Sequence, residues 1–529
     1  MDKKRLGKNT IGILILAVIG AIILTALFVL PPKGAYVTEP VDPDSLPVNE
    51  INIELIGEES QMPSPDFYLL ERADRDTLFC DIGAPSYDDV IYLFTGGTKR
   101  RSPLINCDVM TAWDEKITSI VLDLSLNNYI NGRHIVPVYN KLPIVNIEAD
   151  KEEFNEMKGA MEKGITCSAL IMTEQVPQGI EGSVRGRGNT TWTLFAKKPY
   201  TVETERSYNT FGLGKQRKWN FLANAHDKTL LKNEVWFDLA RRLELPYTPE
   251  SELVNLFVNE IYVGVYEITT KVKQDDTFLP LASSDYLVNI GGLSPEQRVE
   301  FTTTNWFADG DEIEGQPYAD VVYPKDIGNV RKEIITAHLN DLFAAIDGTD
   351  DESLDRILDL ESFAKLYWIE EISMNVDASA RSLYIYWDDS RDKFFAGPIW
   401  DMDYTIGSTI KKSDDVDFSV PDGWKIMYIG MWNGLMHHDR FRECAERIYN
   451  DYDLSTMLYD SISLYKERSK ELIPEANLDY MEHIDEEKYY ELDRDFTSYT
   501  TYTNDTIQFY QERADWIKDA MKSGIPACQ

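Results

Sequence analysis

The chain has few cysteines and histidines, and neither residue type forms a pattern of known chemistry. Its five cysteines in 529 residues include no CxxC pair, and its six histidines are scattered. This spacing excludes a disulfide-scaffold protein and provides no zinc-ligand pattern. The sequence also lacks low-complexity tracts and fixed-period repeats, so it gives no sign of a repeat architecture.

Positive charge is scarce as well. Lysine and arginine number 53 against 90 aspartates and glutamates, which gives a formal net charge of −37. A surface this negative repels nucleic acid, so we expect no nucleic-acid partner. It can attract a basic exported or surface protein as substrate, or it can simply keep the protein soluble. Both interpretations stay open.

What the chain does contain is an uncharged N-terminal run, residues 11–30. At ~1.5 Å per residue, a helix of this length spans the ~30 Å hydrocarbon core of a bilayer. Basic residues within positions 1–10 favour a cytoplasmic N-terminal tail. We therefore expect a single-pass protein in the cell membrane with its C-terminal ectodomain outside. A cleaved signal peptide is the alternative.

The rest of the chain divides by its patterning. Prolines crowd residues 31–50 and predict a stiff stalk. Residues 51–141 show short β-type runs between turn residues, which predicts a small all-β, sandwich-like domain of unknown role. Residues 142–522 are β-rich with one helix and then mainly helical, before a short tail at 523–529. This order predicts a two-lobed α+β domain with its site between the lobes.

Apolar periodicity places individual elements within that domain. Asp227 can cap a helix over residues 228–243, whose apolar stripe is Leu231, Val235, Leu239 and Leu243. A hairpin is expected over residues 254–268, turning near Asn259. Further helices are expected over residues 330–346, 360–372, 440–449, 455–472 and 503–521.

A basic, glycine-interrupted stretch is a candidate phosphate site. It reads RGRGNTTW from Arg185, followed by KKPY from Lys197. Glycines let backbone N–H groups approach phosphate oxygens, and the basic side chains supply positive charge. A hairpin turn that needs positive φ at Gly186 or Gly188 explains the same glycines.

Two acidic loops flank a predicted β-hairpin. Asp377 follows a predicted helix, and Asp401 and Asp403 follow the second strand of the hairpin. Protein kinases place a catalytic aspartate before such a hairpin and a metal-binding aspartate after it. The first orients or deprotonates the acceptor hydroxyl, and the second holds the metal that neutralises phosphate charge.

Taken together, these stretches resemble the CotH kinase family, the spore-coat protein H group. The residues that carry the resemblance are, in chain order, RGRGNTTW, KKPY, KWNFLANAHDKTLLKNEV, VNLFVNEIYVGVYEI, YPKD, NVDASARSLYIYWDD and GPIWDMDYTIG. The resemblance covers residues 142–522. It implies an atypical, bilobal protein-kinase fold that uses ATP and Mg or Mn to phosphorylate Ser or Thr of exported proteins.

The resemblance also implies roles for particular residues. The matching acidic positions make Asp377 the catalytic aspartate and Asp401 the main metal ligand, helped by Asp403. Ser382 stands where many members have an asparagine ligand, five residues after the catalytic aspartate. A serine hydroxyl is a shorter and weaker metal ligand than an amide carbonyl.

On the nucleotide side, Arg187 and Asn189 occupy the family's RGN positions. Lys198 is the first choice for the phosphate-binding lysine, and Lys197 is nearly equal to it. Thr270 stands where the family commonly has a glutamate. These departures leave a second function open, that of a pseudokinase or surface or coat assembly protein that binds without catalysis. A carbohydrate-binding or coat-structural module centred on residues 51–147 is a third.

Overall fold

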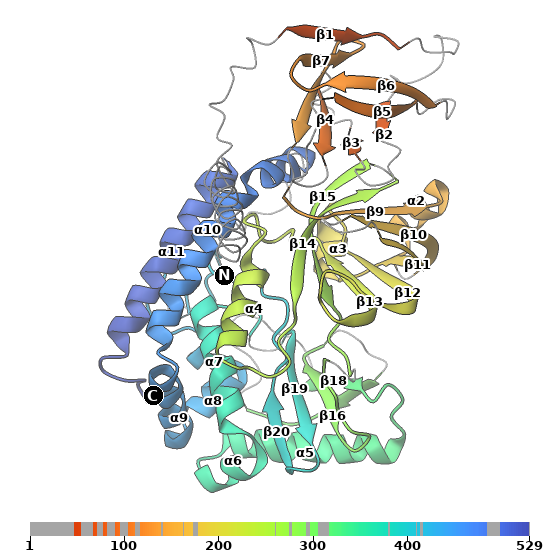
Figure 1. Ribbon diagram of the computed structural model, residues 1–529. Coiled ribbons are helices and arrows are strands. Elements are labelled where there is room, and N and C mark those ends of the chain that lie inside the picture. The colour runs from red at the N-terminus through yellow and green to blue at the C-terminus, as the bar shows by residue number, and fades with distance from the viewer. Residues whose placement is uncertain are drawn as a thin grey trace, which may run out of the picture.

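The structure is a computed structural model of mixed α and β composition (Figure 1). It describes residues 47–53, 67–70, 78–81, 90–95, 104–111, 117–138, 141–161, 163–172, 178–259, 261–274, 278–292, 297–304, 317–378, 381–408, 410–412, 416–483 and 498–527. The α+β class expected from the sequence is therefore confirmed. The kinase-like, two-lobed arrangement remains a prediction.

The first described residues form strands only, at the end of the molecule drawn uppermost in Figure 1. They make one eight-stranded sheet rather than two separate ones, in the order β1-β7-β8-β4-β3-β2-β5-β6. The strands are β1 (Val48–Ile51), β2 (Phe67–Leu70), β3 (Leu78–Asp81), β4 (Val90–Thr95), β5 (Leu104–Thr111), β6 (Ile117–Asp123), β7 (Asn127–Ile130) and β8 (Arg133–Val138). Its buried core includes Ile91, Leu93, Val109 and Leu122.

A closed seven-stranded barrel follows, in the order β10-β11-β12-β13-β15-β14-β9. Its strands are β9 (Ile144–Ala149), β10 (Ile165–Met172), β11 (Gln178–Gly186), β12 (Tyr200–Asn209), β13 (Lys215–Leu222), β14 (Ser251–Val258) and β15 (Ile261–Thr270). Two short helices, α2 (Lys151–Gly159) and α3 (Thr190–Leu194), interrupt the strands. The expected β14–β15 hairpin is confirmed, and Asn259 at its turn takes the left-handed conformation with φ 50°.

Helix α4 (Lys232–Arg242) connects β13 to β14 and begins four residues later than predicted. The reason is the carboxylate of Asp227, which accepts the N–H groups of Thr229 at 2.9 Å and Lys232 at 2.8 Å. It therefore holds the intervening residues in turns and satisfies the first helical N–H from outside the helix. The predicted stripe is correct, because Leu231, Val235, Leu239 and Leu243 are all buried.

The helical part, residues 278–527, carries a five-stranded sheet and most of the helices. The sheet order is β17 (Arg298–Glu300), β18 (Tyr318–Tyr323), β16 (Tyr286–Ile290), β19 (Leu383–Asp388) and β20 (Lys393–Ala396). The helices are α5 (Asn329–Asp347), α6 (Asp351–Ile357), α7 (Leu360–Ser373), α8 (Gly430–Met436), α9 (Asp439–Asp451), α10 (Leu454–Glu482) and α11 (Tyr499–Ala520). The five helices expected here are confirmed, although α10 runs ten residues further than predicted. In Figure 1, α10 and α11 lie side by side and reach the level of the barrel.

The expected location in the cell membrane is corrected here. No helix within the described ranges is both long and apolar enough to cross a bilayer. Residues 11–30, on which the expectation rested, lie outside the described residues, as do the basic tail and most of the proline-rich stalk. We therefore withdraw the membrane location and the outward orientation that depended on it.

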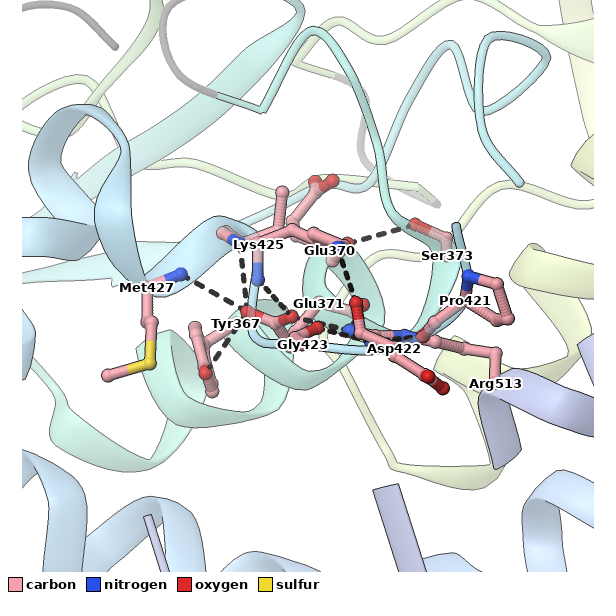
Figure 2. A network of polar contacts seen from close by, with 11 residues as sticks. Tyr367, Glu370, Glu371, Ser373, Pro421, Asp422, Gly423, Lys425, Met427 and Arg513 are labelled. Carbon is pink, nitrogen blue, oxygen red and sulfur yellow. Dashed lines mark hydrogen bonds and ion pairs between the residues drawn. The ribbon is translucent and has the colours of Figure 1, made fainter. Parts of the chain in front are cut away.

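A buried ion pair ties the last helix to the interior of the helical part (Figure 2). Arg513 of α11 donates to Glu371 of α7 at 2.5 Å, and both side chains are fully buried. Glu371 also accepts the backbone N–H groups of Lys425 and Ile426 at 2.8 Å and of Met427 at 3.1 Å. The arginine in turn donates to the carbonyls of Pro421 and Gly423. One carboxylate therefore joins three segments that are far apart in sequence.

We expect Arg513→Ala to lower the free energy of unfolding by about 3–5 kcal/mol, because it leaves the Glu371 carboxylate buried and without its cation. Urea denaturation of the full chain measures this loss. The matched control is Lys522→Ala, whose partner Asp519 is exposed on the same helical segment, and it should unfold at the wild-type urea concentration. Equal midpoints for Arg513→Ala and wild type would contradict the prediction.

Candidate functional site

The two acidic loops lie against each other at the end of helix α7. Met374 takes φ 53°, which ends α7 in a left-handed residue and turns the chain toward Asp377. The N–H of Val376 donates to the carbonyl of Tyr404 at 3.3 Å, and the N–H of Ile406 donates to Ser373 at 2.8 Å. These bonds align the loop before β19 with the loop after β20, although 24 residues separate Asp377 from Asp401.

Ser382 and Asp401 meet directly at this junction. The Ser382 hydroxyl donates to the Asp401 carboxylate at 3.0 Å. Both residues have positive φ, 53° for Ser382 and 62° for Asp401. A non-glycine residue in this region stores strain of about 1–3 kcal/mol, and such strain gathers at functional sites. The predicted metal-binding serine and aspartate are thus brought together in strained conformations.

Electrostatics show that the other acidic residues are close by. The half-buried Asp403 has a pKa well above its ordinary value, mainly through burial and then through the negative charges of Asp401, Asp227 and Asp377. Lys232 opposes this rise. Because charge repulsion falls with distance, Asp401, Asp227 and Asp377 lie near enough to Asp403 to act on its pKa, and we call these four residues the acidic cluster.

Arg187 faces this cluster from the barrel. Burial lowers the pKa of its guanidinium, while Asp401, Tyr384 and Asp403 raise it again. The guanidinium lies 5.8 Å from the ring centroid of Trp400, the residue before Asp401. Asn189 is exposed two residues further on and begins α3 without a side-chain cap bond. The structure therefore brings Arg187 to the acidic residues, whereas Asn189 lies exposed at the start of α3.

The two candidate lysines make other interactions. Lys197 is 4% exposed and donates to Asp479 of α10 at 2.6 Å and to the carbonyl of Val265 at 2.7 Å. Gly264 permits this approach, since a Cβ there would lie 2.3 Å from the Asp479 carboxylate. Lys198 donates to backbone carbonyls at the end of α3. These bonds end on α10, β15 and α3 and not on the acidic loops, so both roles in nucleotide binding remain predictions.

Lys197 and Asp227 also line a small cavity of about 30 Å³, together with Asp479 and His483. This volume suits a water molecule and not a nucleotide. It lies under the end of α10, where His483 contacts the carbonyl of Val263 at 3.1 Å.

Sequence reasoning missed two cationic or titratable residues beside the cluster. Lys232 is 3% exposed, and its amine donates to the backbone carbonyl of Asp403 at 3.4 Å. His226 packs between the rings of Phe195 and Tyr404, and burial lowers its pKa to about 4 although Asp401 opposes the shift. Sequence patterns carried little signal for Lys232, because it is the first residue of α4 and is followed by the polar Asn233 and Glu234.

The oxygen donors at this junction fit a small divalent cation. Within the described ranges, no group of three or more His, Cys, Asp or Glu side chains could hold a metal by itself. Mg²⁺, however, is usually held by one or two carboxylates together with phosphate oxygens and waters. Two aspartates and a hydroxyl provide that partial set, and a cation would relieve the repulsion that raises the pKa of Asp403.

The sequence model of the CotH kinase protein family matches residues 184–523. The chain belongs to the CotH kinase family. The match spans more than half of the 529 residues. It confirms the resemblance inferred from the motifs. No curated protein matches the sequence significantly.

The match locates the candidate site within the CotH region. It includes Arg187, both lysines, the serine and all three predicted aspartates. Strands β9 and β10 precede the matched residues, yet β9 pairs with β10 and β14 and so closes the same barrel. The barrel therefore contains residues from both sides of residue 184.

Another buried carboxyl adjoins the loop that carries Asp377. Glu370 of α7 is 5% exposed, and burial raises its pKa to about 8, with a further increase from Asp377 and a decrease from its hydrogen bond with Asn375. The protonated form therefore persists at neutral pH in the folded chain.

This shift has a definite sign in the pH dependence of stability. Between its ordinary pKa of 4.5 and about 8, Glu370 holds a proton in the folded state that the unfolded state releases. Its contribution to stability is therefore complete below about pH 4.5 and is lost as pH rises through about 8. We expect Glu370→Gln to lose less stability than wild type between about pH 5 and about pH 8.5, measured by urea denaturation. Glu512→Gln, at an exposed position of α11, should keep the wild-type slope.

Proposed function

We propose that this CotH family member is a phosphotransferase that uses ATP with Mg or Mn and phosphorylates Ser or Thr of a basic protein. The observation that carries the proposal is the junction of two acidic loops, with Asp377 on one and Asp401 and Asp403 on the other. Arg187 faces them from the barrel. Phosphoryl transfer needs this combination of carboxylates and a guanidinium around one point.

Each residue has a separate task in the proposed reaction. Asp377 orients the acceptor hydroxyl and receives its proton as the new oxygen–phosphorus bond forms and the bond to ADP breaks. Asp401, Asp403 and Ser382 would hold the metal. The metal, when bound, neutralises charge on the phosphates. Arg187 and Lys232 offer further positive charge to the transferred group.

The origin of these residues favours a two-lobed kinase arrangement. Arg187 follows β11 of the barrel, whereas the three aspartates belong to the helical part. The barrel and the helical part also have largely separate apolar cores. The site therefore lies where two differently built parts of the chain meet, as expected for a nucleotide held between lobes.

The net charge of −37 favours a basic protein as the phosphate acceptor. Opposite charge raises the encounter rate between an enzyme and its substrate and depends strongly on salt.

A pseudokinase is the second candidate function, and two observations favour it. Lys197 is held in a buried ion pair with Asp479, and Lys198 is bonded to carbonyls of the α3 segment. In addition, the weaker ligand Ser382 replaces an amide. A chain of this kind would bind nucleotide without transferring phosphate.

Nucleotide binding should depend on the metal and on Asp401. A ligand present at 100 times its Kd and bound only by the folded state stabilises that state by about 2.7 kcal/mol. We expect ATP with Mg²⁺ or Mn²⁺ to raise the melting temperature of the full chain, and Asp401→Ala to remove the increase. An increase of wild-type size in Asp401→Ala would contradict the assignment of the metal ligand.

Catalysis should depend on Asp377 separately from binding. We expect Asp377→Ala to lower transfer of labelled γ-phosphate at least about 100-fold, while the ATP-induced thermal shift remains, since a general base acts mainly in the transition state. Ser382→Asn should raise transfer if the hydroxyl limits metal binding.

If wild type, Ser382→Asn and Asp377→Ala all bind ATP but transfer no phosphate to themselves or to basic acceptors, the kinase proposal fails. The pseudokinase alternative would then stand.

A further inference from the structure

Glu267 of β15 is a buried carboxyl that the proposed reaction does not use. It is 1% exposed, and burial raises its pKa to about 7 against the lowering by neighbouring hydrogen bonds. Its Oε2 atom accepts from the side-chain amides of Asn233 at 3.0 Å and Asn224 at 3.2 Å. A carboxyl removed from water needs such partners, so this position is held by specific bonds.

Asn233 continues the chain of bonds toward the acidic loop. It is 2% exposed at the start of α4, and its Oδ1 accepts the backbone N–H of Met402 at 2.8 Å. An amide side chain has two donors at one end and an acceptor at the other. Because Glu267 takes the donor end, the carbonyl end of Asn233 must face Met402.

Helix α4 also binds the backbone carbonyl of Met402, through Trp236 and Thr405. The indole of Trp236 donates to the hydroxyl of Thr405 at 3.0 Å, and that hydroxyl donates to the carbonyl of Met402 at 3.0 Å. Both backbone polar groups of Met402 are therefore bound. Since Met402 lies between Asp401 and Asp403, fixing its two peptide planes constrains the Cα–Cβ bonds from which both carboxylates extend.

We propose that Glu267 and Asn233 are positioning residues that form a relay from the barrel to the carboxylates of Asp401 and Asp403. The inference rests on the proposed function, in which those two carboxylates hold a metal. The left-handed φ of 62° at Asp401 supports it, because a strained residue keeps its conformation only when hydrogen bonds and packing hold the surrounding backbone in place. Groups behind metal ligands commonly control metal affinity in this way.

The relay predicts that substitutions at Asn233 and Glu267 weaken metal binding, although neither side chain is a proposed metal ligand. We expect Asn233→Ala and Glu267→Leu each to weaken Mn²⁺ binding about 10-fold or more in the presence of ATP. Electron paramagnetic resonance of free Mn²⁺ with the full chain measures this without requiring catalysis. Glu267→Gln keeps an acceptor for Asn233 and should restore near wild-type affinity. The double variant should bind no worse than Asn233→Ala, because both changes break one relay.

Asn255→Ala is the matched control, since Asn255 is also a fully buried barrel asparagine but is bonded to Tyr262. Its Mn²⁺ affinity should equal that of wild type, and an equal loss there would overturn the relay. The relay is also overturned if Asn233→Ala and Glu267→Leu bind Mn²⁺ normally while Asp401→Ala does not, an outcome that leaves the proposed function intact. A wild-type chain that binds no Mn²⁺ with ATP would overturn the proposed function together with the relay.

Discussion

The carboxylate of Glu371 is the constraint on which the helical part depends. It is fully buried, and it accepts bonds from Arg513 of α11 and from three consecutive backbone N–H groups of residues 425–427. A buried charge of this kind is tolerated only while its partners stay in place. The buried carboxylate therefore couples three features of the fold. These are the docking of α11, the path of residues 421–427 and the position of α7. Because Glu371 lies six residues before Asp377, the same carboxylate fixes where the loop that carries Asp377 begins.

From that anchor, the site is built by backbone bonds more than by side-chain contacts. The loops on either side of the β19–β20 hairpin bind each other through Val376 and Ile406, and α4 binds the second loop at Met402. These hydrogen bonds hold the backbone around Ser382 and Asp401, which keep their strained, positive φ angles. The candidate metal ligands consequently lie on a framework that is attached to both the barrel and α7. Such preorganisation is what stabilisation of transferred charge requires.

Local sequence patterns predicted the local structure, including the two acidic loops of the candidate site. The stripe from Leu231 to Leu243, the β14–β15 hairpin and the two acidic loops follow from periodicity and spacing, which act over a few residues. Partnerships across the fold could not be predicted in this way. Lys197 stands in a basic stretch that suggests phosphate binding, yet it forms an ion pair with Asp479, which is 282 residues away. Likewise, nothing beside Glu267 in sequence indicates Asn233, and the late start of α4 depends on an acceptor outside the helix.

Because the chain has few lysines and arginines, some of its buried carboxylates are paired with a cation and others are not fully neutralised. Lys197 and Arg513 are buried beside Asp479 and Glu371, so each of these cations neutralises a buried carboxylate. Around Asp403 the balance is different, because three other carboxylates, those of Asp401, Asp227 and Asp377, raise its pKa against the opposing charge of Lys232. A bound divalent cation would lower the electrostatic free energy at this cluster. In an acidic chain, therefore, the excess of carboxylates at the junction of the two loops makes that junction a candidate site for a divalent cation.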